Sequence, residues 1–201
     1  MQGRKKIALF CLILKKSVPL QKILYIDNMQ FDFRIDKLTH SLEDATTGDI
    51  LLTSVLPLEK ADLKVISRKS GWKFNWRTEH TALPKQVYKL VLQNQPEIIQ
   101  GLICFEKKAD HVFMCLIETA PHNFGKTKKY IGVAGNLVAF GCKLSFEYGF
   151  SGYVAFESKT KLISHYESTL GARVLFGQRM ELNTNASAKL VNQYYPEFFN
   201  K

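Results

Sequence analysis

Hydrophobic and polar residues follow two different periods along this chain, and the periods occur in a definite order. Alternation over residues 31–35 predicts a half-buried first strand. Apolar residues at helical spacing over residues 58–70 predict a helix that ends at Gly71, because glycine readily adopts the left-handed conformation of a helix C-terminus. Residues 72–84 fit neither period and are aromatic and polar.

Three strand-like segments follow with short breaks, at residues 86–93, 98–106 and 111–119. Turns this short join antiparallel neighbours and predict a β-meander. Helix and strand periods then alternate, over residues 136–148 (helix), 152–156 (strand), 162–170 (helix), 173–182 (strand) and 186–196 (helix). A helical crossover makes at least one strand pair parallel. We therefore expect the α/β (α+β) class, with a mixed, mostly antiparallel sheet packed against helices.

The composition places this pattern in one packed domain. The chain has 201 residues, 46% of them hydrophobic and 23% charged, and a chain of this length buries most of its apolar surface unaided. We assign residues 29–201 to the domain and residues 1–28 to a basic leader. The apolar run Ile7–Leu14 is too short to span a bilayer, and no A-x-A cleavage site follows it. Met29 leaves open an origin of the leader from an upstream start codon.

The net charge of +10 bears on partners rather than on fold. Two interpretations stay open: a solvated surface, or attraction to a polyanion, either a nucleic acid or the phosphates of a cofactor. The cysteines form no C-x-x-C pair and have apolar neighbours, which favours a reducing compartment, the cytoplasm, over a disulfide or zinc framework; they are Cys11, Cys104, Cys115 and Cys142. No residue set has the spacing of a metal site.

The stretch Lys129–Gly135, KYIGVAG, carries the clearest chemical signal. It lies between the last strand of the meander and a helix. A glycine-rich turn at a helix start directs free backbone N–H groups outward, and the helix adds a partial positive charge. Lys126, Lys128 and Lys129 add point charges beside it. The stretch predicts a phosphate seat; the alternative is a tight turn beside a solvated loop.

The same stretch resembles a known coenzyme A motif. Lys129–Ala134 is similar to the R/Q-x-x-G-x-G/A motif of the GNAT-superfamily N-acetyltransferases, and His165–Ala172 (HYESTLGA) to the family's second-helix signature, F-Y-x-x-x-G-F. The order of elements over residues 30–182 also matches. Two features depart from the pattern: lysine replaces Arg or Gln at position 129, and Glu157–Lys159 (ESK) stands where relatives often carry asparagine.

The resemblance implies a GNAT-like sheet with helices on both faces and acetyl-CoA as co-substrate. The diphosphate would lie on the motif loop and the pantetheine arm beside the preceding strand. The residues implied in cofactor binding are Leu116, Ile117, Thr119, Lys129, Tyr130, Ile131, Gly132, Val133, Ala134 and Gly135. A strand amide would stabilise the developing oxyanion.

Two residues are the implied catalytic candidates. Tyr166 stands where relatives often protonate the leaving thiolate, and a phenol donates readily; the alternative is core packing. Glu118 stands where relatives often carry a general base; the alternative is a surface carboxylate. His122 and His165 are weaker substitutes for the base.

The acceptor carries no recognisable motif. A small amine, an antibiotic, a peptide N-terminus and a lysine side chain all stay open, and so does a monomer or a homodimer. No membrane association is expected. A second function also stays open, in which the fold is a basic binding module for nucleic acid or protein. Its motivation is residues 72–77, where aromatic and basic side chains interleave.

Overall fold

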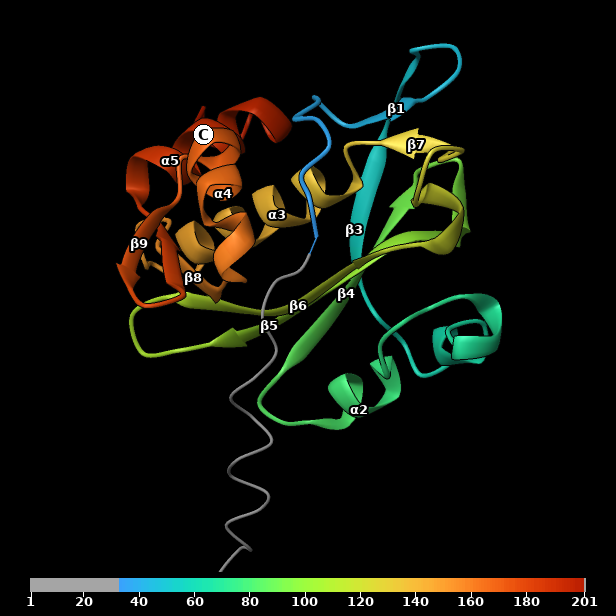
Figure 1. Cartoon of the computed structure of the whole chain (residues 1–201), viewed down its shortest axis with the longest axis horizontal. Helices are drawn as coiled ribbons and strands as arrows, with labels where there is room; N and C mark the ends of the chain where they lie inside the picture. Colours follow the sequence, from blue (N-terminus) through green and yellow to red (C-terminus); the bar gives the residue numbers. More distant parts are fainter. Residues whose placement is uncertain (1–32, 201) are drawn as a thin grey trace, which may run out of the picture.

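The computed structural model describes residues 33–200, so the predicted leader, residues 1–28, lies outside the described part. One seven-stranded sheet dominates it, with the order β3-β4-β5-β6-β8-β10-β9 (Figure 1). The strands are β3 (Thr53–Pro57), β4 (Gln86–Leu92), β5 (Gln95–Lys107), β6 (Val112–Thr119), β8 (Val154–Glu157), β9 (Arg173–Phe176) and β10 (Arg179–Leu182).

The meander β4-β5-β6 is antiparallel throughout, as predicted. Its strands alternate between two apolar environments, one on each face. Ile103, Phe105 and Met114 belong to the larger core cluster, whereas Leu102 and Leu116 belong to the smaller one. A sheet buried on both faces needs cover on both, and helical elements provide it.

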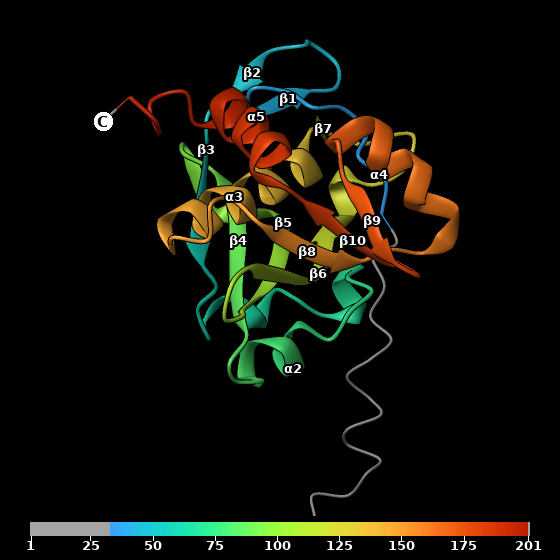
Figure 2. The same ribbon diagram turned by 90° about the vertical axis from the view of Figure 1, so that its left-hand side faces the viewer.

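Helices lie on both faces of the sheet, which confirms that prediction (Figure 2). The larger core contains α3 (Val133–Glu147), α4 (Ile163–Leu170) and α5 (Thr184–Tyr194). On the other face, Trp72 and Trp76 anchor the smaller core with the short helix α2 (Trp76–Thr81). Helix α3 is buried along most of its length because the sheet and α5 cover opposite sides of it.

The pair β6·β8 is parallel, with α3 as its crossover. Its register runs from Val112↔Val154 to Met114↔Phe156 and stops there, although β6 continues to Thr119. The β5–β6 register shifts at the same level, where Cys115 is the extra residue of a β-bulge. Bulges bend a strand and increase its twist. The two strands therefore separate beyond Met114 and leave a gap between them.

The predicted strand over residues 31–35 is wrong for residues 33–35, which form no strand; residues 31–32 lie outside the description. Their alternation is real, but it fits a groove beside α4. Ile35 is 4% exposed, and its backbone N–H donates to His165 Nε2 at 2.9 Å instead of to a neighbouring strand. The sheet begins at β3.

A small second sheet, order β2-β1-β7, follows this segment. It consists of β1 (Leu42–Asp44), β2 (Ile50–Leu51) and β7 (Tyr130–Ile131). Because β7 is part of the predicted phosphate loop, the N-terminal hairpin holds that loop in place.

Two further predictions are corrected. The helix over residues 58–70 is two single turns, η1 (Asp62–Lys64) and η2 (Arg68–Ser70), because the Ser67 and Ser70 side chains form a capping box that starts a new turn. The strand over residues 173–182 is the hairpin β9-β10. Gly177, at φ +55°, makes the turn in it.

In residues 33–200, no helix has the length and apolarity to cross a membrane.

Candidate functional site

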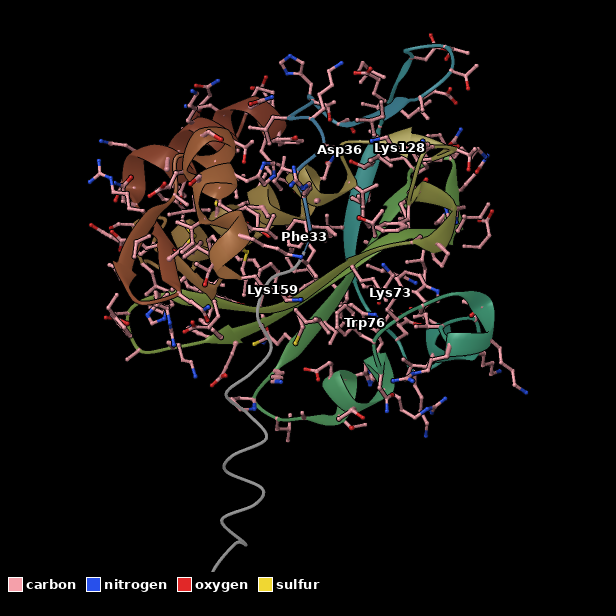
Figure 3. All side chains as sticks on the ribbon, viewed as in Figure 1. Phe33, Asp36, Lys73, Trp76, Lys128 and Lys159 are labelled. Atoms are coloured by element: carbon pink, nitrogen blue, oxygen red, sulfur yellow. The ribbon has the colours of Figure 1, made fainter. Side chains whose placement is uncertain are left out.

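A cavity of about 480 Å³ lies where β6 and β8 separate. Four segments far apart in the sequence meet there: residues 33–36, the end of β6 with the loop after it, the start of α3, and the segment after β8. Its lining consists of Phe33, Arg34, Asp36, Thr119, Asn123, Phe124, Gly125, Lys128, Val133, Ala134, Lys161 and Leu162. Figure 3 labels Phe33, Asp36 and Lys128 around this region.

The predicted phosphate seat lies at the start of α3. Gly132 is the N-cap at φ +88°, a conformation that favours glycine. A Cβ there would also collide with Thr39 Oγ1. The N–H groups of Val133, Ala134 and Gly135 belong to the first turn of the helix, where no intrahelical acceptor exists. These donors and the helix dipole favour a negative group at this end.

Polar side chains below the loop fix its position. The Asn123 amide donates to Gln100 Oε1 at 2.8 Å and accepts the backbone N–H of Tyr130 at 3.1 Å. His122 Nε2 lies 2.9 Å from the same Gln100 oxygen. Asn123 and Gln100 are both buried. This network joins β5 to β7 and explains why the loop keeps one conformation.

A carboxylate of the chain itself already occupies the anion seat. Asp36 Oδ1 accepts the backbone N–H of Gly132 at 3.2 Å, and Asp36 Oδ2 lies 2.7 Å from Lys128 Nζ. The carboxylate of Asp36, from the N-terminal segment, is thus bonded to the loop at Gly132, and phosphate binding there stays a prediction.

The predicted cofactor residues divide into three groups. Thr119, Val133 and Ala134 line the cavity, and Gly132 binds Asp36. Leu116 and Ile117 belong to opposite core clusters, on either face of β6. The others turn away from the cavity: Lys129 lies over the ring of Tyr130, Tyr130 packs in the core, Ile131 pairs with Glu43 of β1, and a Cβ on Gly135 would meet Tyr194.

Tyr166 is fully buried on α4 and does not itself line the cavity. Its hydroxyl donates to the carbonyl oxygen of Phe33 at 2.6 Å, and Phe33 lines the cavity. Its ring packs edge-on against Phe156, with centroids 5.4 Å apart. Tyr166 thus packs in the core and binds, through its hydroxyl, a residue that borders the cavity.

Glu118 lies on the opposite face of the sheet, among the residues of the smaller core. Its carboxylate accepts three hydrogen bonds: from the backbone N–H of Lys73 at 2.6 Å, from that of Phe74 at 3.4 Å, and from Trp76 Nε1 at 2.6 Å. The side chain is 7% exposed, so it is no surface carboxylate. The structure gives it an anchoring role, and its role as a base stays a prediction.

Sequence reasoning missed Asp36, Lys161 and Asn123 as residues of this region. Asp36 continues the polar side of the alternation that begins at residue 31, and that side of a half-buried strand is expected to face solvent. The basic residue that reaches the seat is Lys128 rather than the motif's own first residue, Lys129. The lysines at positions 126, 128 and 129 indicated this region, but the sequence did not show which of them reaches the seat.

Two histidines near the cavity predict a pH dependence of stability. Burial lowers the pKa of His122 and His165 from the usual value, and the charges of Lys129 and Arg34 lower the pKa of each further. The unfolded chain therefore binds protons more readily than the folded chain below about pH 6.5, so stability falls as the pH falls.

We expect a lower melting temperature at pH 5.5 than at pH 7.5, measured by circular dichroism. The double variant His122→Gln/His165→Gln is expected to show a flatter profile than the unmodified chain. A melting temperature that rises on acidification would contradict the prediction.

No family model and no curated protein matches the chain. Solved structures do resemble it in fold. A GNAT-family acetyltransferase from Staphylococcus aureus Mu50 is 11% identical, with a TM-score of 0.45, over 66% of this chain and 99% of that one. AtaTR bound with AcCoA is 13% identical, with a TM-score of 0.46, over 69% and 97%. Spermidine/spermine N-acetyltransferase SpeG from Vibrio cholerae is 13% identical, with a TM-score of 0.43, over 68% and 95%.

The topology of this chain agrees with the GNAT-like fold by its own features. Two helical turns and α2 precede a three-stranded meander, α3 crosses over to a parallel strand, and the sheet opens at that pair. The predicted architecture, a mixed and mostly antiparallel sheet with helices on both faces, is confirmed.

Proposed function

We propose that this chain is an N-acetyltransferase that moves an acetyl group from acetyl-CoA to an amine by direct attack. The observation that carries the proposal is the gap between β6 and β8, with the start of α3 at its mouth. An open strand edge and an anion seat side by side suit a ligand with an amide-bearing arm and a diphosphate. The seat already accepts a carboxylate, so its chemistry fits the phosphate end of acetyl-CoA.

The chain's own groups support acyl transfer at this gap. Beyond Met114, backbone N–H groups of β6 that point away from β5 face the gap instead of β8. Such donors stabilise the negative charge that develops on a carbonyl oxygen under attack. The Tyr166 hydroxyl binds the carbonyl oxygen of Phe33, a residue that lines the cavity, and from there it would donate a proton to the leaving thiolate. Acetyl-CoA would supply the thioester.

The first test is isothermal titration with acetyl-CoA. We expect binding by the unmodified chain and at least about tenfold weaker binding by Gly132→Ala, because a Cβ at a positive φ beside Thr39 displaces the first amides of α3. Gly149→Ala is the matched control. It also has a positive φ, but nothing lies within 4 Å of the added Cβ. A panel of amine acceptors, followed by release of free thiol, then tests transfer.

No binding heat at millimolar acetyl-CoA would overturn the proposal, and equal affinity of the two glycine variants would remove the loop from the site. In this proposal the acceptor is an amine, the protein is a monomer or a homodimer, and the compartment is the cytoplasm.

A second candidate function is a binding module for nucleic acid. Residues 58–77 carry six basic and two acidic side chains, and all six basic ones are exposed: Lys60, Lys64, Arg68, Lys69, Lys73 and Arg77. Phosphate binding by such a surface weakens steeply with salt. Salt-dependent binding of RNA without thiol release from acetyl-CoA would favour this function over catalysis.

A further inference from the structure

We infer that residues 33–36 are a built-in competitor of the cofactor: Asp36 takes the place of the diphosphate, residues 33–35 border the gap and narrow it, and acetyl-CoA must displace them. This inference rests on the proposed function, because it assigns the same gap to acetyl-CoA. It adds that the chain controls access to its own site.

The first support is the position of Asp36. Its two carboxylate oxygens take one loop amide, from Gly132, and one cation, Lys128. A phosphate at the start of α3 would seek the same two kinds of donor, because both are directed at one point. Two anions cannot share that point, since like charges repel and each needs the same donors. Binding at the seat is therefore exclusive.

The second support is the course of the backbone toward the gap. Phe33, Arg34 and Asp36 line the cavity together with Thr119 of β6 and Ala134 of α3. Figure 1 shows the segment in blue, between α4 and β3 in that view. It thus runs from the anion seat along the side of the gap.

The third support is the set of contacts between this segment and α4, the helix that carries Tyr166. The Tyr166 hydroxyl donates to the Phe33 carbonyl at 2.6 Å, and the Ile35 N–H donates to His165 Nε2 at 2.9 Å. The rings of Phe33 and Tyr166 also pack, with centroids 5.9 Å apart. While the segment is bound, the proposed proton donor is engaged with the chain itself.

The contact at the anion seat is the weakest hold on the segment, whereas Ile35 is buried in the larger core. The Asp36–Lys128 pair has side chains about one quarter exposed (28% and 27%), and exposed pairs contribute little. Residues 33–38 form no ladder with a strand. From Thr39 onward the chain is anchored, because the Thr39 N–H donates to Tyr194 Oη at 2.9 Å and β1 pairs with β7. Lys37 and Leu38 would then act as the hinge, so the hairpin stays in place.

The test compares Asp36→Asn with Asp49→Asn in titrations with acetyl-CoA. Both variants remove one negative charge from the part of the chain that precedes β2, but Asp49 lies exposed at the β1–β2 turn. If Asp36 competes, the Asp36→Asn variant populates the open state more and binds acetyl-CoA about tenfold more tightly. The Asp49→Asn variant is expected to match the unmodified chain. Equal affinities of all three proteins would overturn the inference and leave the proposed function standing.

A second measurement separates displacement from a simple charge effect. Hydrogen exchange of the Ile35 amide, which His165 accepts, is followed with and without saturating acetyl-CoA in the unmodified chain. Displacement predicts faster exchange at Ile35 and unchanged exchange at Thr39. Unchanged exchange at Ile35 with ligand bound would overturn the inference even if Asp36→Asn binds more tightly. No binding by any of the proteins would instead overturn the proposed function, and the competitor with it.

Discussion

Replacing Glu118 with glutamine is expected to lower the free energy of unfolding by about 3 kcal/mol. Glutamine keeps the size of the side chain but puts an NH₂ group where one carboxylate oxygen was. One of the two close donors, the Lys73 N–H or Trp76 Nε1, would then face another donor in a buried site. Thermal denaturation should show a melting temperature lower by about 10 °C for a chain of this size.

The matched control is Glu106→Gln on the neighbouring strand β5. Its carboxylate pairs with Lys108, whose side chain is 39% exposed, and surface pairs contribute at most about 1 kcal/mol. Trp76→Phe gives a second check. If the indole and the carboxylate act as one unit, the double variant should lose less stability than the sum of the single variants.

The result also separates the two roles of Glu118. If Glu118 is an anchor, its replacement lowers the stability, and it lowers the activity only as far as the site is deformed. If Glu118 is a general base, its replacement lowers the rate while the melting temperature stays the same. Unchanged stability together with loss of thiol release would contradict the anchoring role and support the base.

Tyr166→Phe is expected to lower kcat about 100-fold, the usual contribution of a positioned acid. The hydroxyl is the atom that binds the cavity-lining residue Phe33, and phenylalanine keeps the ring contact with Phe156. Because the variant also loses the bond to the Phe33 carbonyl, the affinity for acetyl-CoA should not weaken. A fall in kcat with unchanged or tighter binding is the expected signature, followed by thiol release with saturating acceptor.

The control for this variant is Tyr88→Phe on β4, whose hydroxyl donates to Gln86 at the surface. It should leave kcat unchanged. If Tyr166→Phe folds normally and turns over at the unmodified rate, the hydroxyl has no role as acid and Tyr166 serves the core alone.

The local pattern of the sequence determined the strands of the meander, the helix after the glycine turn and the class of the fold. Alternation over residues 86–93 and 111–119 predicts strands, and their side chains pack into two different cores. Such alternation can be recognised locally, because it depends only on neighbours one or two residues away. The glycine-rich stretch likewise predicted a turn at the start of a helix, and in the structure Gly132 is the N-cap of α3.

The tertiary structure alone decided which groups meet at the site. Residues 33–35 alternate like a strand, yet their partners are His165 and Tyr166, about 130 positions away. Nothing local distinguishes a groove beside a helix from a neighbouring strand. The same holds for Glu118, whose donors come from residues 73–76. Periodicity indicates which side chains along a segment are buried. The identity of their partners depends on contacts that only the folded chain creates.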